Sequence, residues 1–272
     1  MDSRDKMTEE TSSVADLFSL TGKRALITGS AAGIGKAIAI RFGEAGAALE
    51  LADIDEERLN ATGEELAGQG WSVNVHALDI SDREQRSSLW GRLGDTAPDI
   101  LVNNAAIYPF KEFLEVDEEF YKKVMAVNLD AVFWMCQEMI RRRLRQGGVI
   151  VNIGSIEALV PFNDDLTHYS TSKAGVIALT RALAREYGKA GFRINALIPG
   201  GIATEGTKGV AKSVLRGRFK LISSGIKFSQ RLPIGRIGQP DEIARMALVL
   251  ASDVSSYVLG AAIPVDGGFL TT

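Results

Sequence analysis

The sequence predicts an α/β fold, a doubly wound parallel sheet of about seven strands with helices on both of its faces. Two observations predict it. Apolar runs of strand length alternate with runs of helical periodicity over most of the 272 residues. A glycine-rich turn at residues 28–35 joins the first strand-like run to the first helical one, as is common in such sheets.

The expected elements follow in order along the chain. Strands are predicted at residues 24–28, 48–52, 72–77, 100–103, 148–153, 193–198 and 262–265. The clearest helices are predicted at residues 33–45, 55–67, 119–145, 172–190 and 241–251. Right-handed crossovers between parallel strands would place a ligand crevice at the carboxyl ends of the strands.

Composition limits the protein class. A hydrophobic content of 46% and 28 glycines fit a globular chain with many tight connections. We expect one domain over residues 20–272, a flexible leader at 1–19, and a long insertion at 205–231 that breaks the alternation. The leader lacks the apolar core of a signal peptide, and a lone cysteine, Cys136, fits a reducing compartment, so the cytoplasm is expected. A net charge of −3 gives no reason to expect nucleic acid, and no run is long enough to span a bilayer.

The glycine-rich turn predicts a pyrophosphate site. Gly29, Gly33 and Gly35 would let the backbone turn sharply and approach the ligand, and Ser30 and Ile34 lie in the same turn. The negative charge of the pyrophosphate would meet the N-terminus of the helix that follows. Turn glycines without a ligand are the plainer alternative.

Asp53 ends the second predicted strand, where an adenosine ribose would lie. Its carboxylate can accept hydrogen bonds from both ribose hydroxyls and would repel a 2′-phosphate, so we expect NAD(H) rather than NADP(H). Neither Ala32 nor Ile54 offers a basic side chain there; Arg24 or Lys36 could compete by reaching in. Asp53 could instead cap the next helix, a role that Asp55 fits equally well.

Tyr169 and Lys173 predict acid–base chemistry. Residues four apart lie on one face of a helix, one turn from each other. The Lys173 ammonium should favour the phenolate and lower the pKa of Tyr169 from about 10 towards neutrality. A phenol of that kind can donate and accept protons at physiological pH.

Together these motifs resemble the short-chain dehydrogenase/reductase family from about Leu20 to Gly268. The resemblance rests on the turn at 28–35, Asp79-Ile80, Asn103 to Ala106, Asn128, Ser155, Tyr169 with Lys173, Pro199-Gly200 with Thr204, and Val265 to Gly268, in the family's order. It implies a Rossmann-like fold and an NAD-dependent oxidoreductase that interconverts a secondary alcohol and a ketone.

The resemblance also implies residue roles. Ser155 would polarise the substrate oxygen, Tyr169 would exchange the proton, and Lys173 would bind the nicotinamide ribose. The Asn128 main chain would hold a water that connects Lys173 to solvent. Further cofactor contacts are implied for Ile54, Asp79, Ile80, Asn104, Ala105, Ala106, Pro199, Gly200, Ile202 and Thr204, with Ala106 standing where the family usually has glycine. Substrate contacts are implied for Ser155, Glu157, Tyr169 and Gly200.

Other interpretations stay open. An NADPH-dependent 3-oxoacyl-thioester reductase shares this fold and these four catalytic residues, and a non-catalytic nucleotide-binding protein is a further alternative. The substrate could be a sugar, a polyol or a small hydroxy or keto compound. His76 and His168 are isolated and no Cys/His cluster exists, so no metal is expected; His168 is taken as a loop residue. Apolar surface on the helices at 119–145 and 172–190 predicts a homotetramer, as in the resembling enzymes.

The charged residues near the predicted crevice are compatible with either an anionic or a neutral substrate. The insertion at 205–231, a substrate flap by resemblance, carries seven basic residues: Lys208, Lys212, Arg216, Arg218, Lys220, Lys227 and Arg231. They could attract an anionic substrate or stay in solvent. Opposite them, Glu157, Asp164 and Asp165 would suit a neutral polyol. The segment from Ser155 to Tyr169 is one residue longer than the family commonly has, which predicts a bulge at 161–166 beside the substrate.

Overall fold

The computed structural model describes residues 12–94, 97–204 and 231–272. Seven parallel strands form one sheet in the order β3-β2-β1-β4-β5-β6-β7. They are β1 (Arg24–Thr28), β2 (Ala48–Asp53), β3 (Val73–Ala77), β4 (Ile100–Asn103), β5 (Gly148–Ile153), β6 (Phe192–Pro199) and β7 (Ala262–Val265). Each lies where the sequence predicts a strand, so the predicted fold class is confirmed.

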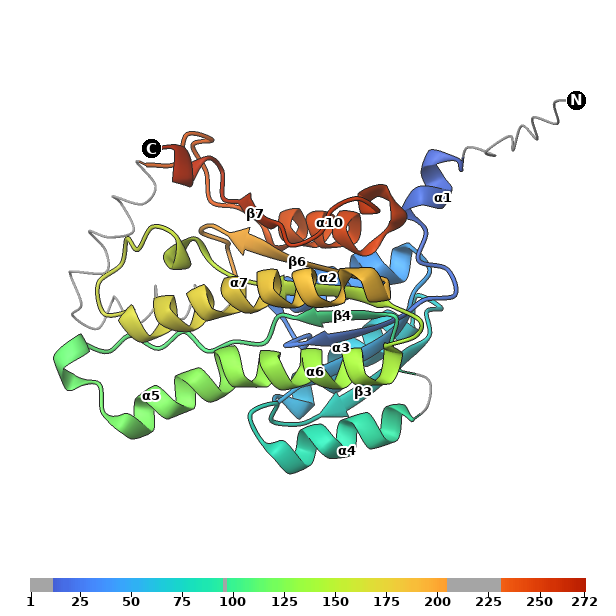
Figure 1. The fold of residues 1–272 in the computed structure, drawn as a ribbon, viewed down its shortest axis with the longest axis horizontal. Coiled ribbons are helices and arrows are strands. Elements are labelled where there is room, and N and C mark those ends of the chain that lie inside the picture. The colour runs from blue at the N-terminus through green and yellow to red at the C-terminus, as the bar shows by residue number, and fades with distance from the viewer. Residues whose placement is uncertain (1–11, 95–96, 205–230) are drawn as a thin grey trace, which may run out of the picture.

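Helices cover both faces of the sheet. One core cluster packs α2 (Gly33–Glu44), α3 (Glu56–Ala67) and α10 (Pro240–Ala251) on one face. A second packs α4 (Arg83–Leu93), α6 (Ala131–Arg143) and α7 (Thr167–Tyr187) on the other. Figure 1 shows α6 and α7 crossing the near face of the sheet. Phe42 and Trp90, each almost wholly buried, anchor the two clusters.

The long helix predicted at 119–145 consists of three segments. α5 (Glu118–Met125) and α6 are joined by a π-helix at Ala126–Asp130. A π-helix of this kind is a single-turn bulge inside a longer helix, and no residue type marks it in the sequence. Asn128 lies inside it and is fully buried.

One further helix boundary and two further helices add detail to the expected elements. α7 begins at Thr167, five residues before the predicted start, so Tyr169 lies in its first turn. α4 lies between β3 and β4, where the alternation of strands and helices leaves room for a helix, but it is not among the clearest predicted helices because Leu89, Trp90 and Leu93 give it only a narrow buried face. Val14–Phe18 form the short helix α1 within the expected leader, where Ser13 and Asp16 make a reciprocal capping box.

Single 3₁₀ turns lie at Phe113–Glu115 (η1), Ile156–Ala158 (η3), Gly188–Ala190 (η4), Asp253–Ser255 (η5) and Phe269–Thr271 (η6). The strand order reverses beside β1: the chain builds β2 and β3 on one side, then returns to place β4 on the other. Loops leaving the carboxyl ends of β1 and β4 therefore diverge. That divergence is where doubly wound sheets open a ligand crevice.

Candidate functional site

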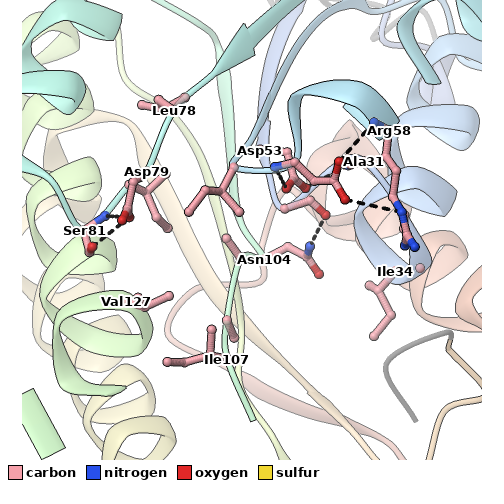
Figure 2. A pocket seen from close by; sticks show the side chains of 18 of the residues that line it. Ala31, Ile34, Asp53, Arg58, Leu78, Asp79, Ser81, Asn104, Ile107 and Val127 are labelled. Atoms are coloured by element: carbon pink, nitrogen blue, oxygen red, sulfur yellow. Dashed lines mark hydrogen bonds and ion pairs between the residues drawn. The ribbon is translucent and has the colours of Figure 1, made fainter. Parts of the chain in front are cut away.

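A cavity of about 680 Å³ lies at this edge, bounded by the segments that follow β1, β2, β3 and β4. Eleven of the predicted cofactor residues line it: Gly29, Gly33, Ile34, Asp53, Ile54, Asp79, Ile80, Asn104, Ala105, Ala106 and Thr204. Figure 2 shows several of their side chains around the opening. Ser30, Gly35, Tyr169, Lys173, Pro199, Gly200 and Ile202, also predicted to bind cofactor, are not among its lining residues.

The glycine-rich turn is built for close backbone approach. Gly29 has φ 66°, and a Cβ there would lie 2.7 Å from Ala105 Cα. A Cβ on Gly35 would lie 2.0 Å from the carbonyl oxygen of Gly29, so that position packs the turn rather than lining the cavity. Ser30 is buried and its hydroxyl donates to Ala52 O at 3.3 Å.

The N-terminus of α2 suits an anion. Its N-cap residue, Ala32, makes no side-chain hydrogen bond, and the first turn contains no acid. The first amide groups of α2, at Gly33 and Ile34, therefore have no capping side chain, and both residues line the cavity. The positive end of the helix dipole and these donors fit a pyrophosphate.

Asp53 is anchored at the neighbouring corner. Its carboxylate accepts hydrogen bonds from Ala31 N at 2.9 Å and Asp55 N at 3.0 Å. Asp55, and not Asp53, caps α3 by accepting from Arg58 N at 3.1 Å. The Arg58 side chain also lines the cavity and forms a 3.3 Å ion pair with Asp55, as Figure 2 shows. A basic group thus stands beside Asp53, which the sequence analysis did not foresee.

Arg24 and Lys36, the cations considered as competitors, are engaged elsewhere. Arg24 Nε pairs with Glu50 at 2.7 Å, and Lys36 Nζ pairs with Glu65 at 2.6 Å. Neither residue lines the cavity.

The segments after β3 and β4 are fixed by their own polar groups. One Asp79 oxygen accepts from Ser81 N at 2.8 Å and Ser81 Oγ at 2.7 Å, which shapes the turn containing Ile80. Asn104 Nδ2 donates to Thr28 O and Gly29 O at 3.0 and 2.9 Å, tying β4 to the glycine turn. Ala106 does not have a positive φ, so its methyl group imposes no backbone strain.

The segment after β6 closes the far side. Gly200 N donates to Val265 O at 3.1 Å, and a Cβ at Gly200 would lie 2.7 Å from Asp266 Cα. Pro199 pairs with Val265 at the end of β6, and Ile202 is buried. Thr204 lines the cavity directly opposite Gly33.

Ser155, Tyr169 and Lys173 lie together beyond the carboxyl end of β5. Ser155 and Tyr169 share a side-chain hydrogen bond. Lys173 Nζ lies 5.9 Å from the centre of the Tyr169 ring and donates to Ile153 O at 2.8 Å. Lys173 is 2% exposed and has no carboxylate partner among the described residues.

The expected lowering of the Tyr169 pKa is wrong for this structure. Burial raises the pKa of Tyr169 to about 12; the Ser155 hydrogen bond opposes this and the Glu157 charge adds to it. Burial also lowers the pKa of Lys173 to about 8. Removal from water disfavours both the Tyr169 phenolate and the Lys173 ammonium. This effect outweighs the attraction that two such charges would have one helical turn apart.

Asn128 joins this cluster to the cavity. Its side chain accepts from Ile107 N and donates to Ile107 O, both at 2.9 Å, and donates to Ser172 Oγ at 3.2 Å. Ile107 and Val127 line the cavity, whereas Ser172 is next to Lys173 in α7. The three hydrogen bonds of Asn128 therefore connect the end of the cavity to the helix that carries Lys173. The side chain of Asn128 is fully used here, which leaves its main chain for the predicted water.

Residues 161–166, where the sequence predicts a bulge, form a non-helical connection between η3 and α7. Asp165 has φ 66°, a positive φ found at no other non-glycine residue in the described ranges. Glu157 is 2% exposed, so its carboxylate is turned away from solvent. His168 lies in α7 instead of a loop, and its Nε2 is hydrogen-bonded to Pro109 O at 2.8 Å.

The basic flap lies mostly outside the described residues, which resume at Arg231. Arg231 stacks its guanidinium 4.4 Å from the centre of the Phe269 ring and donates to Thr272 O at 2.8 Å. In the part of the chain that is described, no group of three or more His, Cys, Asp or Glu side chains could hold a metal ion. None of the described helices has the length and apolarity needed to cross a membrane.

The sequence analysis missed some lining residues. Arg58, Leu78, Ile107, Lys123 and Val127 also border the cavity. Leu78 is adjacent to the predicted Asp79, and Ile107 is adjacent to the predicted Ala106. Extending each of these two motifs by one residue would have found them. Arg58 and Lys123 lie on helices and carry no motif signal.

Comparisons with known proteins agree with this geometry. A family model described as enoyl-(acyl carrier protein) reductase matches residues 29–270. The chain is 37% identical to 3-oxoacyl-[acyl-carrier-protein] reductase FabG of Thermotoga maritima over 259 residues, covering 92% of this chain and 99% of that protein. It is 38% identical to galactitol 2-dehydrogenase (L-tagatose-forming) of Cereibacter sphaeroides over 256 residues, covering 93% and 97%.

The chain also matches solved structures over nearly its whole length. A short-chain type dehydrogenase/reductase from Mycobacterium marinum superimposes with a TM-score of 0.88 at 32% identity, covering 96% of this chain and 100% of that one. A gluconate 5-dehydrogenase from Burkholderia cenocepacia J2315, in complex with NADP and tartrate, gives a TM-score of 0.86 at 31% identity, with the same coverage.

Proposed function

The chain belongs to the short-chain dehydrogenase/reductase family of nicotinamide-dependent oxidoreductases, and we propose that it interconverts a secondary alcohol and a ketone with NAD(H). The single observation that carries this proposal is the cluster of Ser155, Tyr169 and Lys173, positioned beyond β5 and linked through Asn128 to the cavity. A purely nucleotide-binding protein would have no need of a Tyr–Lys–Ser cluster in which the lysine is buried without a carboxylate partner among the described residues.

The cofactor would occupy the cavity. Its pyrophosphate would lie at the N-terminus of α2, its adenosine ribose at Asp53, and its adenine beside Asp79 and Ile80. Ala105, Ala106 and Thr204 would border its nicotinamide half, with Pro199, Gly200 and Ile202 supporting that wall from behind. When bound, the cofactor supplies hydride exchange with a substrate carbon.

The chain's own residues would manage the proton. Tyr169 would donate its phenolic proton to the substrate oxygen in ketone reduction and accept one in alcohol oxidation. Ser155, hydrogen-bonded to Tyr169, would orient the same oxygen. Lys173 would hold the nicotinamide ribose, with Asn128 fixing the helix beside it.

We propose NAD(H) as the preferred cofactor because the Asp53 carboxylate stands where a 2′-phosphate would have to fit. Arg58 is the counterargument, since it lines the same end of the cavity and could pair with a phosphate. Arg58 also forms an exposed 3.3 Å ion pair with Asp55, which would not prevent it from contacting a phosphate. The similarity to an NADP-bound gluconate 5-dehydrogenase makes this preference worth direct measurement.

The proposed substrates are sugars, polyols and small hydroxy or keto compounds, contacting Ser155, Tyr169 and Gly200. Similarity to galactitol 2-dehydrogenase supports a polyol. The second candidate is a 3-oxoacyl-thioester reductase using NADPH, supported by similarity to 3-oxoacyl-[acyl-carrier-protein] reductase. A homotetramer in the cytoplasm completes the proposal, the location being supported by the lone cysteine, Cys136.

One screen separates the two candidates. Galactitol, gluconate and a panel of other polyols are offered with NAD⁺ or NADP⁺, and 3-oxoacyl thioesters with NADH or NADPH, following the absorbance of the reduced nicotinamide. Oxidation of a polyol with NAD⁺ at the highest kcat/KM supports the proposal. Turnover confined to thioesters with NADPH replaces it with the second candidate, and no turnover of any compound by the wild-type protein would contradict both.

A further inference from the structure

Glu157 is a buried acid to which the proposed mechanism assigns no role. It lies in η3, two residues after Ser155, and is 2% exposed. Burying a carboxylate is costly unless hydrogen bonds compensate for the lost water. Its surroundings therefore identify what it holds in place.

Among the described residues, the hydrogen bonds to the Glu157 carboxylate come from the bulge at 161–166 and from the start of α7. One oxygen accepts from Asn163 Nδ2 at 3.0 Å and Asn163 N at 3.3 Å. The other accepts from Phe162 N at 3.3 Å, and the Ser170 hydroxyl also bonds to this side chain. These donors fill the carboxylate, so it has no free face for a substrate hydroxyl.

Asn163 extends the network across the site. Its Nδ2 also donates to the hydroxyl of Tyr108 at 3.2 Å, on the segment that follows β4. The Tyr108 ring in turn meets the Tyr169 ring edge-on, with 4.7 Å between ring centres and 82° between ring planes. A chain of contacts thus runs from Glu157 through Asn163 and Tyr108 to the phenol of Tyr169.

Two more contacts bind the same segments together. Lys111 N donates to Asp165 O at 3.0 Å, and His168 Nε2 is hydrogen-bonded to Pro109 O at 2.8 Å. Segment 107–111 and the bulge therefore form one wall beside Tyr169. Within that wall, Glu157 accepts more hydrogen bonds than any other side chain described there.

We propose that Glu157 is a positioning residue for Tyr169: it holds the bulge and, through Asn163, the Tyr108 ring that sets the orientation of the Tyr169 phenol. This deepens the proposed function and rests on it for the role of Tyr169. Glu157 was expected to contact substrate; its full set of protein donors assigns it to the wall instead.

The same geometry gives Glu157 an electrostatic effect. The titratable groups that face Tyr169 in the described chain are Tyr108 after β4, Glu157 in η3 and Lys173 in α7. A charge on Glu157 raises the pKa of both tyrosines, secondary to burial. Removing that charge while keeping the shape should make the Tyr169 phenolate easier to form.

The test compares Glu157→Ala with Glu157→Gln. Glutamine keeps one oxygen for Asn163 and removes the charge, whereas alanine removes the whole anchor. We expect Glu157→Ala to lower kcat about 10- to 100-fold through misalignment of Tyr169. The Kd for NAD⁺, measured by fluorescence titration, should stay within about twofold, since Glu157 does not line the cavity. Glu157→Gln should recover most of kcat and move the acid limb of alcohol oxidation to lower pH.

Matched control variants separate the effect of Glu157 from the effect of removing any nearby carboxylate. Glu112→Gln removes an exposed carboxylate that caps nothing on the neighbouring η1 segment, and should change neither kcat nor the pH limb. Tyr108→Phe keeps the ring and loses the Asn163 bond, so it should lose less activity than Tyr108→Ala. If Glu157→Ala fails to fold, the Glu157→Gln and Tyr108 variants carry the test. Equal losses in Glu157→Ala and Glu157→Gln with an unmoved pH limb would overturn the proposal.

A readout without substrate separates this inference from the proposed function. Phenolate absorbance after a rapid jump to alkaline pH is recorded for each protein and for its Tyr169→Phe counterpart, and the difference isolates Tyr169. The Tyr169 titration should move to lower pH in Glu157→Gln even if no alcohol is turned over. An unmoved titration contradicts the electrostatic part of the proposal whether or not the wild-type protein is active.

Discussion

Tyr169 holds its proton more firmly than the Tyr–Lys spacing alone suggests. Its neighbour Lys173 is buried and donates one hydrogen bond to the carbonyl of Ile153, while Tyr169 is half-buried, and removal from water raises the pKa of its phenol. The residue spacing was correct, but the environment decided the pKa. Spacing on a helix can be read from sequence; the amount of water excluded by the rest of the fold cannot.

This environment predicts different pH dependences for the two directions of reaction: kcat/KM for ketone reduction should change little from about pH 6 to 8, whereas kcat/KM for alcohol oxidation should change. With its pKa raised to about 12, Tyr169 is protonated at neutral pH and ready to donate in ketone reduction. Alcohol oxidation needs the phenolate, so its kcat/KM should rise steadily with pH from about 6 to 8. Profiles of kcat/KM in both directions check this. An oxidation rate independent of pH over that range would contradict it.

Removing the phenolic hydroxyl should abolish turnover without disturbing binding. Tyr169→Phe keeps the ring that packs against Tyr108 and removes the group that exchanges the proton. We expect kcat to fall by at least about 100-fold in both directions while the Kd for NAD⁺ stays within about twofold. Tyr187→Phe, on the same helix but remote from Ser155, is the matched control. Near-normal kcat in Tyr169→Phe would remove Tyr169 from the mechanism.

Asp53 should set the cofactor preference. The wild-type protein is expected to show a higher kcat/KM with NAD⁺ than with NADP⁺, because the carboxylate and a 2′-phosphate would repel each other. Asp53→Asn keeps an acceptor for Ala31 N and removes the charge, so it should improve NADP⁺ use about tenfold or more. Adding Arg58→Gln should reverse that gain if Arg58 is the group that pairs with the phosphate. A wild-type preference for NADP⁺ would show the interpretation of Asp53 to be wrong.

Among the elements, the strands were the most predictable. Four of them, β1, β2, β4 and β6, are apolar runs that are almost wholly buried, which leaves little choice of structure. Helix ends and irregularities were harder. The first turn of α7 contains no aliphatic residue and so carried no apolar signal, and no residue type marks the π-helix around Asn128. The cofactor cradle could be predicted because it is a local motif; the wall of Glu157, Asn163 and Tyr108 joins distant segments and has no local signature.

Strand β2 carries a second buried acid, whose effect is on stability. Burial raises the pKa of Glu50, but hydrogen bonds from His76, Asn74 and Arg24 outweigh this and bring it to about 2. A depressed pKa means that the stabilisation is present above about 4.5 and is lost as pH falls from there towards about 2. The contribution is on the order of a few kcal/mol.

Glu50→Gln should therefore remove part of the acid sensitivity of folding. At pH 7 the variant should unfold at a lower urea concentration than the wild-type protein, and the gap should narrow at pH 3 as wild-type Glu50 gains a proton. Glu118→Gln, which breaks the exposed pair with Lys122, should change stability little at either pH. A gap that is the same at both values would mean that Glu50 acts through packing alone.

At the scale of the whole molecule, most of the apolar residues expected at subunit contacts instead cover the sheet. Val132, Met135, Met139 and Val176 are buried within one chain. Phe133 and Trp134 remain, each more than 40% exposed and packed edge-on against each other on α6. Tyr257 and Leu259, just before β7, are exposed as well. Two apolar patches on different parts of the surface suit two kinds of subunit contact.

We accordingly predict a homotetramer of four 29.3 kDa chains, to be measured by light scattering at micromolar concentration. Replacing Phe133 and Trp134 with lysine should shift the measured mass to a smaller species, because charges would be buried at the contact. Val14→Lys, on exposed α1, is the control and should leave the mass unchanged. A wild-type mass equal to one chain would exclude the prediction.

The reversal of strand order beside β1 has an evolutionary consequence. Residues that line the adenosine end of the cavity come from the first half of the chain, up to Ser81, whereas Ser155, Glu157, Asn163, Tyr169 and Lys173 come from the second. The two halves meet along the β1–β4 pairing. Coenzyme choice and alcohol choice can thus drift separately, and a chimera cut just before β4 could inherit each from a different parent. Free-energy effects of substitutions at Asp53 and Asn163, which share no described partner, should simply add.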